Sequence, residues 1–164
     1  AIVKGAEVIL LASDHTTSDR AIQVASVNNQ RLHLMSGDSL YTPKLLRVAG
    51  MSAVGLVMAV PADLTRSPFR QKYTSLWGTT DPFTWRTALA YDATQALITA
   101  LRQAPSRSGI QDVLSQPNFS TTGATGTVQF VPATGDRKTS VHLITVSPVE
   151  SGAKVTYSFK SLPF

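Results

Sequence analysis

The sequence predicts an α/β fold of doubly wound, mainly parallel sheets with helices on both faces. Three observations lead to this fold class. Hydrophobic residues make up 43% of the 164 residues and charged residues 15%, which is typical of a globular protein. Short apolar runs rich in branched side chains alternate with helical patterns, as in βαβ units. Gly and Pro separate these segments instead of forming tracts, so the chain is not disordered.

The first third of the chain contains the clearest alternation of strand and helix. Residues 7–13 (Glu-Val-Ile-Leu-Leu-Ala-Ser) are predicted to form a strand that is covered on both faces, because successive positions are apolar. Thr17 or Ser18 can cap a helix that carries Ile22, Ala25 and Val27 and ends at Asn28-Asn29. The next elements are a strand at 32–35, a short helix at 43–48, and a strand at 54–60 that Pro61 stops.

The middle of the chain is predicted to be mostly helical. A helix over 69–77 places Phe69, Tyr73 and Trp77 four residues apart, which indicates core packing. A long helix is expected to begin at Asp81-Pro82 and end before Pro105. Its apolar face consists of Leu89, Ala93, Ala96, Leu97, Ala100 and Leu101. A shorter helix at 110–114 and strands at 127–130, 141–146 and 155–159 complete the prediction.

Composition excludes several classes of function. The net charge of +5 raises the question of nucleic acid, but the basic residues are dispersed singly, without a cluster or an aromatic platform, so no nucleic-acid partner is expected. The chain has no Cys, which removes disulfides and thiolate metal sites. The apolar run at 54–60 is too short to span a bilayer, so direct membrane insertion is not expected. Because the chain opens at Ala1 without a Met, we expect a mature fragment or a truncated chain, from which any targeting segment would have been lost.

The sequence gives no support for an enzyme or for a cofactor. Asp14-His15 together with many Ser residues would allow a catalytic triad, but no Gly-x-Ser-x-Gly elbow accompanies them. There is no phosphate-binding loop, and Gly123-Ala-Thr-Gly126 lacks the spacing of a dinucleotide fingerprint. His15, His33 and His142 are too dispersed for a metal site. We therefore expect a non-catalytic protein with no cofactor and no metal.

The order of six motifs resembles the type I periplasmic binding proteins, specifically the branch that binds branched-chain amino acids for ABC transporters. The resemblance spans nearly the whole chain. The combination of Trp85-Arg86-Thr87 with Ala90-Tyr-Asp-Ala93 is most similar to cyanobacterial members. The six motifs are Gly5-Ala-Glu-Val-Ile-Leu-Leu-Ala, Gly37-Asp-Ser-Leu-Tyr41, Gly55-Leu-Val-Met-Ala-Val-Pro61, Ala90-Tyr-Asp-Ala-Thr-Gln-Ala-Leu97, Gly123-Ala-Thr-Gly126 with Val128-Gln-Phe130, and Gly135-Asp-Arg137.

The resemblance implies that this chain is the C-terminal half of a two-lobed protein. Residues 1–60 and 140–164 would belong to the second lobe and residues 61–139 to the first lobe. Val57–Pro61 and Arg137–Val141 would be two of the hinge crossings. The implied function is extracytoplasmic or periplasmic capture of an amino acid or similar small solute in a cleft between the lobes, followed by recognition of the closed form by an ABC transporter permease.

The resemblance also points to residues that would bind the ligand. Asp38 matches the acidic cleft position and would hold the ligand's ammonium group, although Asp in this position can also cap a turn. Asp14 and His15 stand where the family has an aromatic residue that covers the ligand, which opens the possibility of a polar or acidic ligand. A helix-capping role for Asp14 is the alternative. The family's carboxylate donors come largely from the half that is absent here.

Three further residues have both a binding and a structural interpretation. Arg86, next to Trp85 at the start of the long helix, could hold a second carboxylate or could be a surface Arg beside a packing Trp. Tyr41 can line the cleft, but packing is the favoured interpretation. Tyr91-Asp92 is assigned to helix or interlobe packing.

A different function, a ligand-sensing extracellular domain of a receptor or kinase, would use the same pocket and would differ in the segments that flank it.

Overall fold

The computed structural model describes residues 5–65, 67, 69–78, 83–139 and 141–163. The chain divides into two compact units, which we describe separately. Unit 1 consists of residues 1–65 and 141–164, and unit 2 consists of residues 66–140. The predicted helix start at Asp81-Pro82 lies outside the described residues.

Unit 1 is built on a five-stranded sheet with the order β1-β2-β3-β6-β7. Strands β1 (Val8–Leu11), β2 (His33–Ser36) and β3 (Val57–Val60) are parallel, whereas β6 (His142–Ser151) is antiparallel to β3 and to β7 (Lys154–Ser161). A mixed sheet with flanking helices confirms the α/β class, although the sheet is less parallel than the sequence predicts. The difference arises because β6 and β7 return as a hairpin instead of following a crossover helix.

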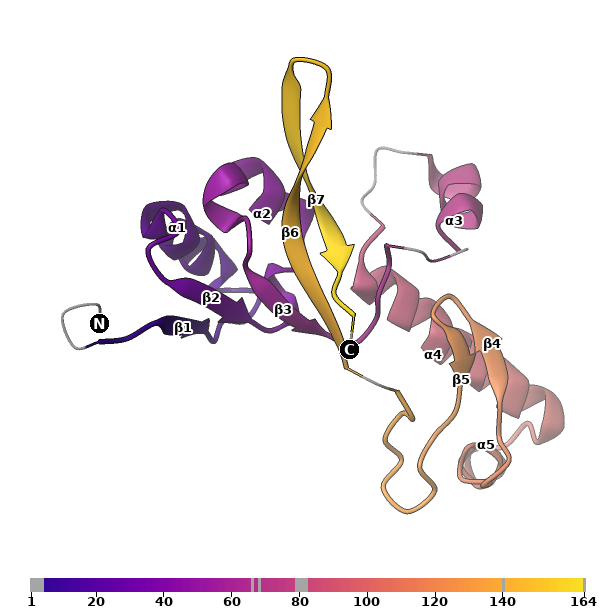
Figure 1. Cartoon of the computed structure of the whole chain (residues 1–164). Helices are drawn as coiled ribbons and strands as arrows, with labels where there is room; N and C mark the ends of the chain where they lie inside the picture. Colours follow the sequence, from indigo (N-terminus) through magenta and orange to yellow (C-terminus); the bar gives the residue numbers. More distant parts are fainter. Residues whose placement is uncertain (1–4, 66, 68, 79–82, 140, 164) are drawn as a thin grey trace. The chain divides into compact units, whose positions relative to one another are not determined.

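Helices connect the parallel strands. Helix α1 (Ser18–Asn28) joins β1 to β2, and α2 (Pro43–Val48) precedes β3. Figure 1 shows both helices on the same side of β1, β2 and β3. Right-handed crossovers that advance in one direction along a sheet place their helices on one face, which explains this arrangement. Ile22, Ala25 and Leu45 bury the apolar faces of these helices, whereas Val27, expected among the helix's packing residues, is exposed.

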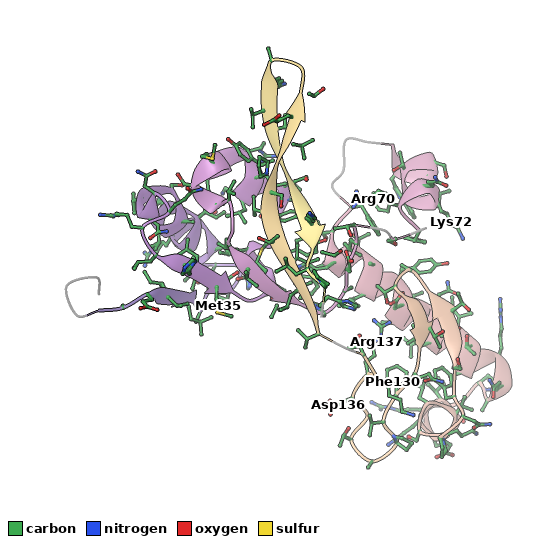
Figure 2. All side chains as sticks on the ribbon, in the orientation of Figure 1. Met35, Arg70, Lys72, Phe130, Asp136 and Arg137 are labelled. Carbon is green, nitrogen blue, oxygen red and sulfur yellow. The ribbon has the colours of Figure 1, made fainter. Side chains whose placement is uncertain are left out.

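The opposite face of β1–β3 is exposed in the described chain. Val8, Leu10 and Met35 are 50%, 67% and 45% exposed, whereas Leu11 and Leu34 on the helix-covered face are buried. The pairing of Leu10 with Met35 puts both side chains on the same face. The label for Met35 lies on the side of the sheet away from α1 and α2 in Figure 2. The described residues therefore cover only one face of the sheet, whereas the sequence predicts that both faces are covered.

Unit 2 is mainly helical. It contains α3 (Phe69–Trp77), α4 (Trp85–Gln103), α5 (Arg107–Leu114) and a small sheet of β4 (Thr121–Gly123) and β5 (Gly126–Val128). Thr84 and Ser106 cap α4 and α5 by accepting hydrogen bonds from the amides of Thr87 and Gly109 at 3.4 and 3.1 Å. The core cluster packs α4 against α5 and β5, and its buried members are Ala96, Ala100, Val113, Phe119 and Val128.

The buried face of α4 agrees with the predicted one at Ala96 and Ala100 and differs from it elsewhere. Its buried residues are Ala88, Asp92, Ala96 and Ala100. Leu97 and Leu101, which the sequence assigns to the apolar face, are each almost half exposed. Apolar periodicity misplaces the face because a charged residue, Asp92, lies at its centre. In α3, Phe69 and Tyr73 are buried as predicted, whereas Trp77 is exposed and its ring lies 5.2 Å from that of Tyr73.

Candidate ligand-binding site at the carboxyl ends of the parallel strands

Two loops meet at the carboxyl ends of β1 and β2. The hydroxyl groups of Ser13, after β1, and Ser39, after β2, are hydrogen bonded at 2.8 Å. This bond holds the loop of Asp14 and His15 next to the loop of Asp38. Ligands of open α/β sheets bind at the carboxyl ends of parallel strands, so this edge is the candidate site in unit 1. Neither Ser was predicted as a site residue from the sequence, although each is a hydroxyl residue shortly after the end of a strand.

Asp14 organises the turn that leads into α1. Its Oδ1 accepts hydrogen bonds from the amide and hydroxyl of Thr16 at 2.8 and 2.7 Å, and from the amide and hydroxyl of Thr17, each at 2.9 Å. The side-chain hydrogen bonds from Thr16 and Thr17, followed by the backbone ones, hold the pKa of the Asp14 carboxyl well below its usual range. Asp14 is therefore ionised and fixed in position. The structure gives it the turn-capping contacts; its contact with a ligand stays a prediction.

His15 lies in the same exposed turn. Its carbonyl oxygen accepts a hydrogen bond from the hydroxyl of Ser18 at 3.3 Å, which attaches the turn to the start of α1. The side chain of His15 is exposed. It is therefore accessible to a ligand at this edge.

Asp38 is the first residue of a short 3₁₀ helix, Asp38–Leu40, that follows β2. The residue is half-buried, and its carbonyl oxygen accepts a hydrogen bond from the amide of Tyr41 at 3.0 Å. Gly37, just before it, leaves open space where a Cβ would stand. The Asp38 side chain is thus carried by a short 3₁₀ helix beside an uncrowded stretch of backbone.

Tyr41 packs in the core of unit 1. It is 6% exposed, and its ring meets that of Phe159 edge-on, with centroids 4.6 Å apart and planes at 77°. These contacts fit the packing interpretation that the sequence favours. Any contact of Tyr41 with a ligand stays a prediction.

Trp85 and Arg86 belong to unit 2, at the start of α4. The guanidinium carbon of Arg86 lies 4.4 Å from the centroid of the Trp85 ring, a cation–π geometry, and Arg86 is exposed. The Trp ring therefore orients a guanidinium that remains accessible to solvent. The two predicted groups of site residues thus lie in different units, one at the strand ends of unit 1 and one at the start of α4.

A buried ion pair joins three segments of unit 2. Asp92, only 2% exposed, lies 3.0 Å from Nη1 of Arg137 and accepts a hydrogen bond from the amide of Ala124 at 2.5 Å. Oδ2, the oxygen that faces Arg137, also accepts a hydrogen bond from the hydroxyl of Thr125, whereas the amide of Ala124 donates to Oδ1. The neighbouring Tyr91 packs its ring 4.2 Å from that of Phe69. These contacts are structural, in agreement with the helix-packing part of the assignment of Tyr91-Asp92.

The described residues contain neither a candidate metal site nor a helix that could span a membrane. No cluster of three or more His, Cys, Asp or Glu side chains suited to a metal occurs among the residues that the structure describes. Of the described helices, none combines the length and the hydropathy needed to cross a membrane.

Comparison with solved structures identifies the fold. The chain superposes on a solute-binding protein of an ABC transporter from Rhodopseudomonas palustris in complex with 4-hydroxybenzoate, with a TM-score of 0.73 at 18% identity. The match covers 98% of this chain and 46% of that chain. The chain therefore has the type I periplasmic binding protein fold.

Other proteins of this binding-protein fold align in the same way. The branched-chain amino acid transporter substrate binding protein of Streptococcus pneumoniae, in complex with isoleucine, gives a TM-score of 0.69 at 17% identity over 98% of this chain and 47% of that chain. A branched-chain amino acid ABC transporter protein from Rhodospirillum rubrum gives 0.64 at 22% identity over 85% and 42%. The chain thus spans less than half the length of these proteins. No protein-family model matches the sequence, and no curated protein is found as a relative.

Proposed function

We propose that this chain forms the C-terminal half of an extracytoplasmic solute-binding protein that captures an amino acid or similar small solute for an ABC transporter. The observation that carries the proposal is the hydrogen bond between Ser13 and Ser39, which joins the Asp14-His15 loop to the Asp38 loop at the carboxyl ends of parallel strands. The similarity to solute-binding proteins that are solved with small carboxylates supports it.

The two units support a two-lobed mechanism. Unit 1 would belong to the second lobe and unit 2 to the first, so that residues 1–60 and 140–164 lie in one lobe and 61–139 in the other. The division between units after Thr65 and before Val141 falls close to these limits. Val57–Pro61 and Arg137–Val141 would act as hinge crossings. Closure would be driven by contacts that the ligand makes only in the closed state.

The residues of this chain would supply one part of the ligand's recognition. Asp38 would accept hydrogen bonds from the ammonium group of an amino acid, and His15 would contact its side chain. Arg86, oriented by Trp85, would hold a second carboxylate if the ligand is acidic. Asp14 and Tyr41 would shape the site by fixing the turn and the loop. No bond is made or broken in this mechanism, so the proposed role is capture and delivery to a permease.

The proposal is tested in the complete two-lobed parent protein. Thermal unfolding is followed with each amino acid, small peptides, urea and amides, because a ligand at about 100 times its Kd adds roughly 2.7 kcal/mol of stability. A selective rise of the Tm with one solute class is expected. If no solute of the panel raises the Tm, transport of an amino acid or similar solute is not the function.

The role of Asp38 is tested by the variant Asp38→Asn. Loss of the charge-assisted hydrogen bond is expected to weaken binding of the identified amino acid by about 1.5–3 kcal/mol, which is roughly a 10- to 150-fold rise in Kd. Asp112→Asn, at an exposed residue of α5, is the matched control. An unchanged Kd in isothermal titration calorimetry of Asp38→Asn would remove Asp38 from the site while leaving the capture function intact.

A further inference from the structure

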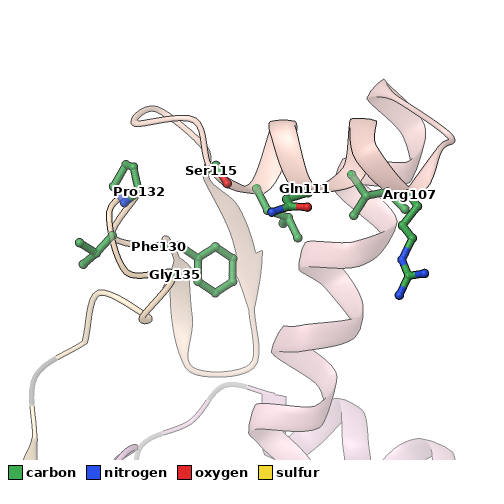
Figure 3. Close-up of a pocket in the computed structure, with 9 residues that line it drawn as sticks. Arg107, Gln111, Ser115, Phe130, Pro132 and Gly135 are labelled. Carbon is green, nitrogen blue, oxygen red and sulfur yellow. The ribbon is translucent and has the colours of Figure 1, made fainter.

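Unit 2 contains a pocket of its own, and none of the predicted site residues lines it. It has a volume of about 390 Å³ and lies between α5 and the loop that follows β5. Figure 3 shows Gln111 and Arg107 on the helix side and Phe130 and Pro132 on the loop side. Ligand pockets in proteins measure about 300–1,000 Å³, so this one suits a small ligand.

The apolar wall of the pocket is part of the packed structure. The ring of Phe130 stacks on that of buried Phe119, with centroids 5.8 Å apart and planes at 24°. Ile110 and Leu114, partly buried, pack from α5 against the same core cluster. The wall therefore consists of side chains whose positions are set by the core, with part of their apolar surface left toward the pocket.

The loop that closes the other side is held by its own hydrogen bonds. The amide of Val131 donates to the carbonyl oxygen of Asp136 at 2.7 Å, and the amide of Gly135 donates to the carbonyl oxygen of Val131 at 2.8 Å. Gly135 has a φ of +74°, a conformation that Gly adopts without strain. A loop fixed in this way loses little further entropy when a ligand binds.

Polar groups stand at the rim of the apolar wall. Arg107 and Gln111 both line the pocket and are one helical turn apart on α5, so they share a face of the helix. Across the described part of the chain, no ion pair or hydrogen bond engages the guanidinium of Arg107. No acidic side chain is among the lining residues. A cation and an amide beside an apolar cavity are the groups that a small carboxylate with an apolar body requires.

We infer that this pocket binds a small monocarboxylate with an aromatic or short aliphatic body, independently of the ligand at the strand ends. The apolar body lies against Phe130, Ile110 and Leu114. The carboxylate accepts hydrogen bonds from the guanidinium of Arg107, which can bind a carboxylate through two parallel N–H groups. Gln111 donates a further hydrogen bond from its side-chain amide.

The test is a titration of the ¹⁵N-labelled complete two-lobed parent protein with 4-methylbenzoate, followed by two-dimensional NMR. Shifts are expected at the backbone amides of Ile110, Gln111, Leu114 and Gly135, with a Kd on the order of 1 mM for so small a ligand. The uncharged analogue 4-methylbenzamide is titrated in parallel. It is expected to bind about 3- to 10-fold more weakly, because a guanidinium at an exposed rim adds a modest charge-assisted contribution.

Two variants complete the test. Arg107→Ala is expected to reduce the affinity for 4-methylbenzoate to that for the benzamide and to leave the benzamide unaffected. Arg102→Ala, at the last turn of α4 and not among the lining residues, is the matched control and should bind both as the original chain does. Equal affinities for the two probes would overturn the inference. Shifts confined to the loop of Asp14 and the loop of Asp38 would also overturn it. The second outcome would assign the carboxylate to the strand-end site and would leave the proposed function standing.

Discussion

The carboxylate of Asp92 lies 3.0 Å from the guanidinium of Arg137, although the two residues are separated by the whole of α5 and the β4–β5 sheet. Both side chains are largely or fully removed from solvent, with exposed fractions of 3% and 19%. The ion pair connects the last segment of unit 2, which contains Arg137, to the middle of helix α4, which contains Asp92.

Removing one partner of this pair should destabilise unit 2. Asp92→Asn leaves the guanidinium of Arg137 without its counter-ion, and loss of one member of a buried pair costs about 3–5 kcal/mol. Both Trp residues, Trp77 and Trp85, lie in unit 2, so Trp fluorescence during urea unfolding reports this unit. Asp112→Asn, at an exposed position, is the control. A change of less than about 1 kcal/mol would show that the pair adds little to stability.

Gly123 is required because of the same carboxylate. A Cβ at this position would lie 2.6 Å from Cγ of Asp92 and 3.0 Å from Cγ2 of Val128, so Gly123→Ala forces the hairpin away from α4. The expected loss is about 1–3 kcal/mol, as for overpacked cores. The exposed neighbour Thr122 provides the control Thr122→Ala. The same Trp-detected unfolding measures both variants, and equal stabilities would contradict the predicted clash.

The carboxyl of Asp63 should give unit 1 a pH-dependent stability. Burial acts to raise the pKa of Asp63, but hydrogen bonds from Ser161 and Thr65 outweigh it and hold the pKa below its usual value of 3.8. Because the pKa is lower in the folded state, the stabilisation is present above the unfolded pKa and is lost as the pH falls through the folded pKa.

The corresponding measurement compares the original chain with Asp63→Asn in urea, by circular dichroism, between about pH 6 and pH 3. The stability difference between the two should be constant at the upper end and should shrink as the pH falls below about 4. Asp112→Asn controls for general effects of charge. A difference that stays constant throughout would mean that Asp63 has the same pKa in both states.

The exposed face of β1–β3 should become protected in the complete protein. Parallel strands are normally covered on both faces, and the matched solved chains are more than twice as long as this one. Since the chain has no Cys, Leu10→Cys introduces a single thiol on this face. Maleimide should label it rapidly in this chain and slowly in the two-lobed parent. Val155→Cys, on an exposed part of β7, is the control.

If Leu10→Cys reacts at the same rate in both proteins, the missing half does not cover this face. The proposed division into lobes would then need another explanation for the apolar residues Val8, Leu10 and Met35.

Local sequence signals predict the helices and strands well but not the coverage of the sheet. Helices α2 and α3 have the predicted limits, because Pro43 and the aromatic spacing of Phe69 and Tyr73 are short-range signals. The apolar run of β1 correctly indicates a parallel strand. It predicts burial on both faces, and the residues that the structure describes cover only one of them.

The sequence predicts individual residues of the candidate site better than it predicts how these residues are arranged in space. Asp14 and Asp38 stand just past strand ends in the sequence, which is enough to bring their loops to one edge of the sheet. The hydrogen bond between Ser13 and Ser39 depends on side-chain geometry across two loops, which no local pattern encodes. The burial of Asp92 was likewise unpredictable from periodicity, because it depends on Arg137 far along the chain.

The pairing of β3 with β6 affects the order in which the chain can fold. Val60 pairs with His142, so the sheet of unit 1 is complete only after unit 2 has been synthesised. Unit 2 is continuous in sequence and can collapse while unit 1 still lacks β6 and β7. Until then the side of β3 that β6 will occupy offers unpaired backbone groups to other chains. During synthesis on the ribosome, unit 2 is therefore able to fold before unit 1 is complete, and unit 1 depends on β6 and β7 to become resistant to aggregation.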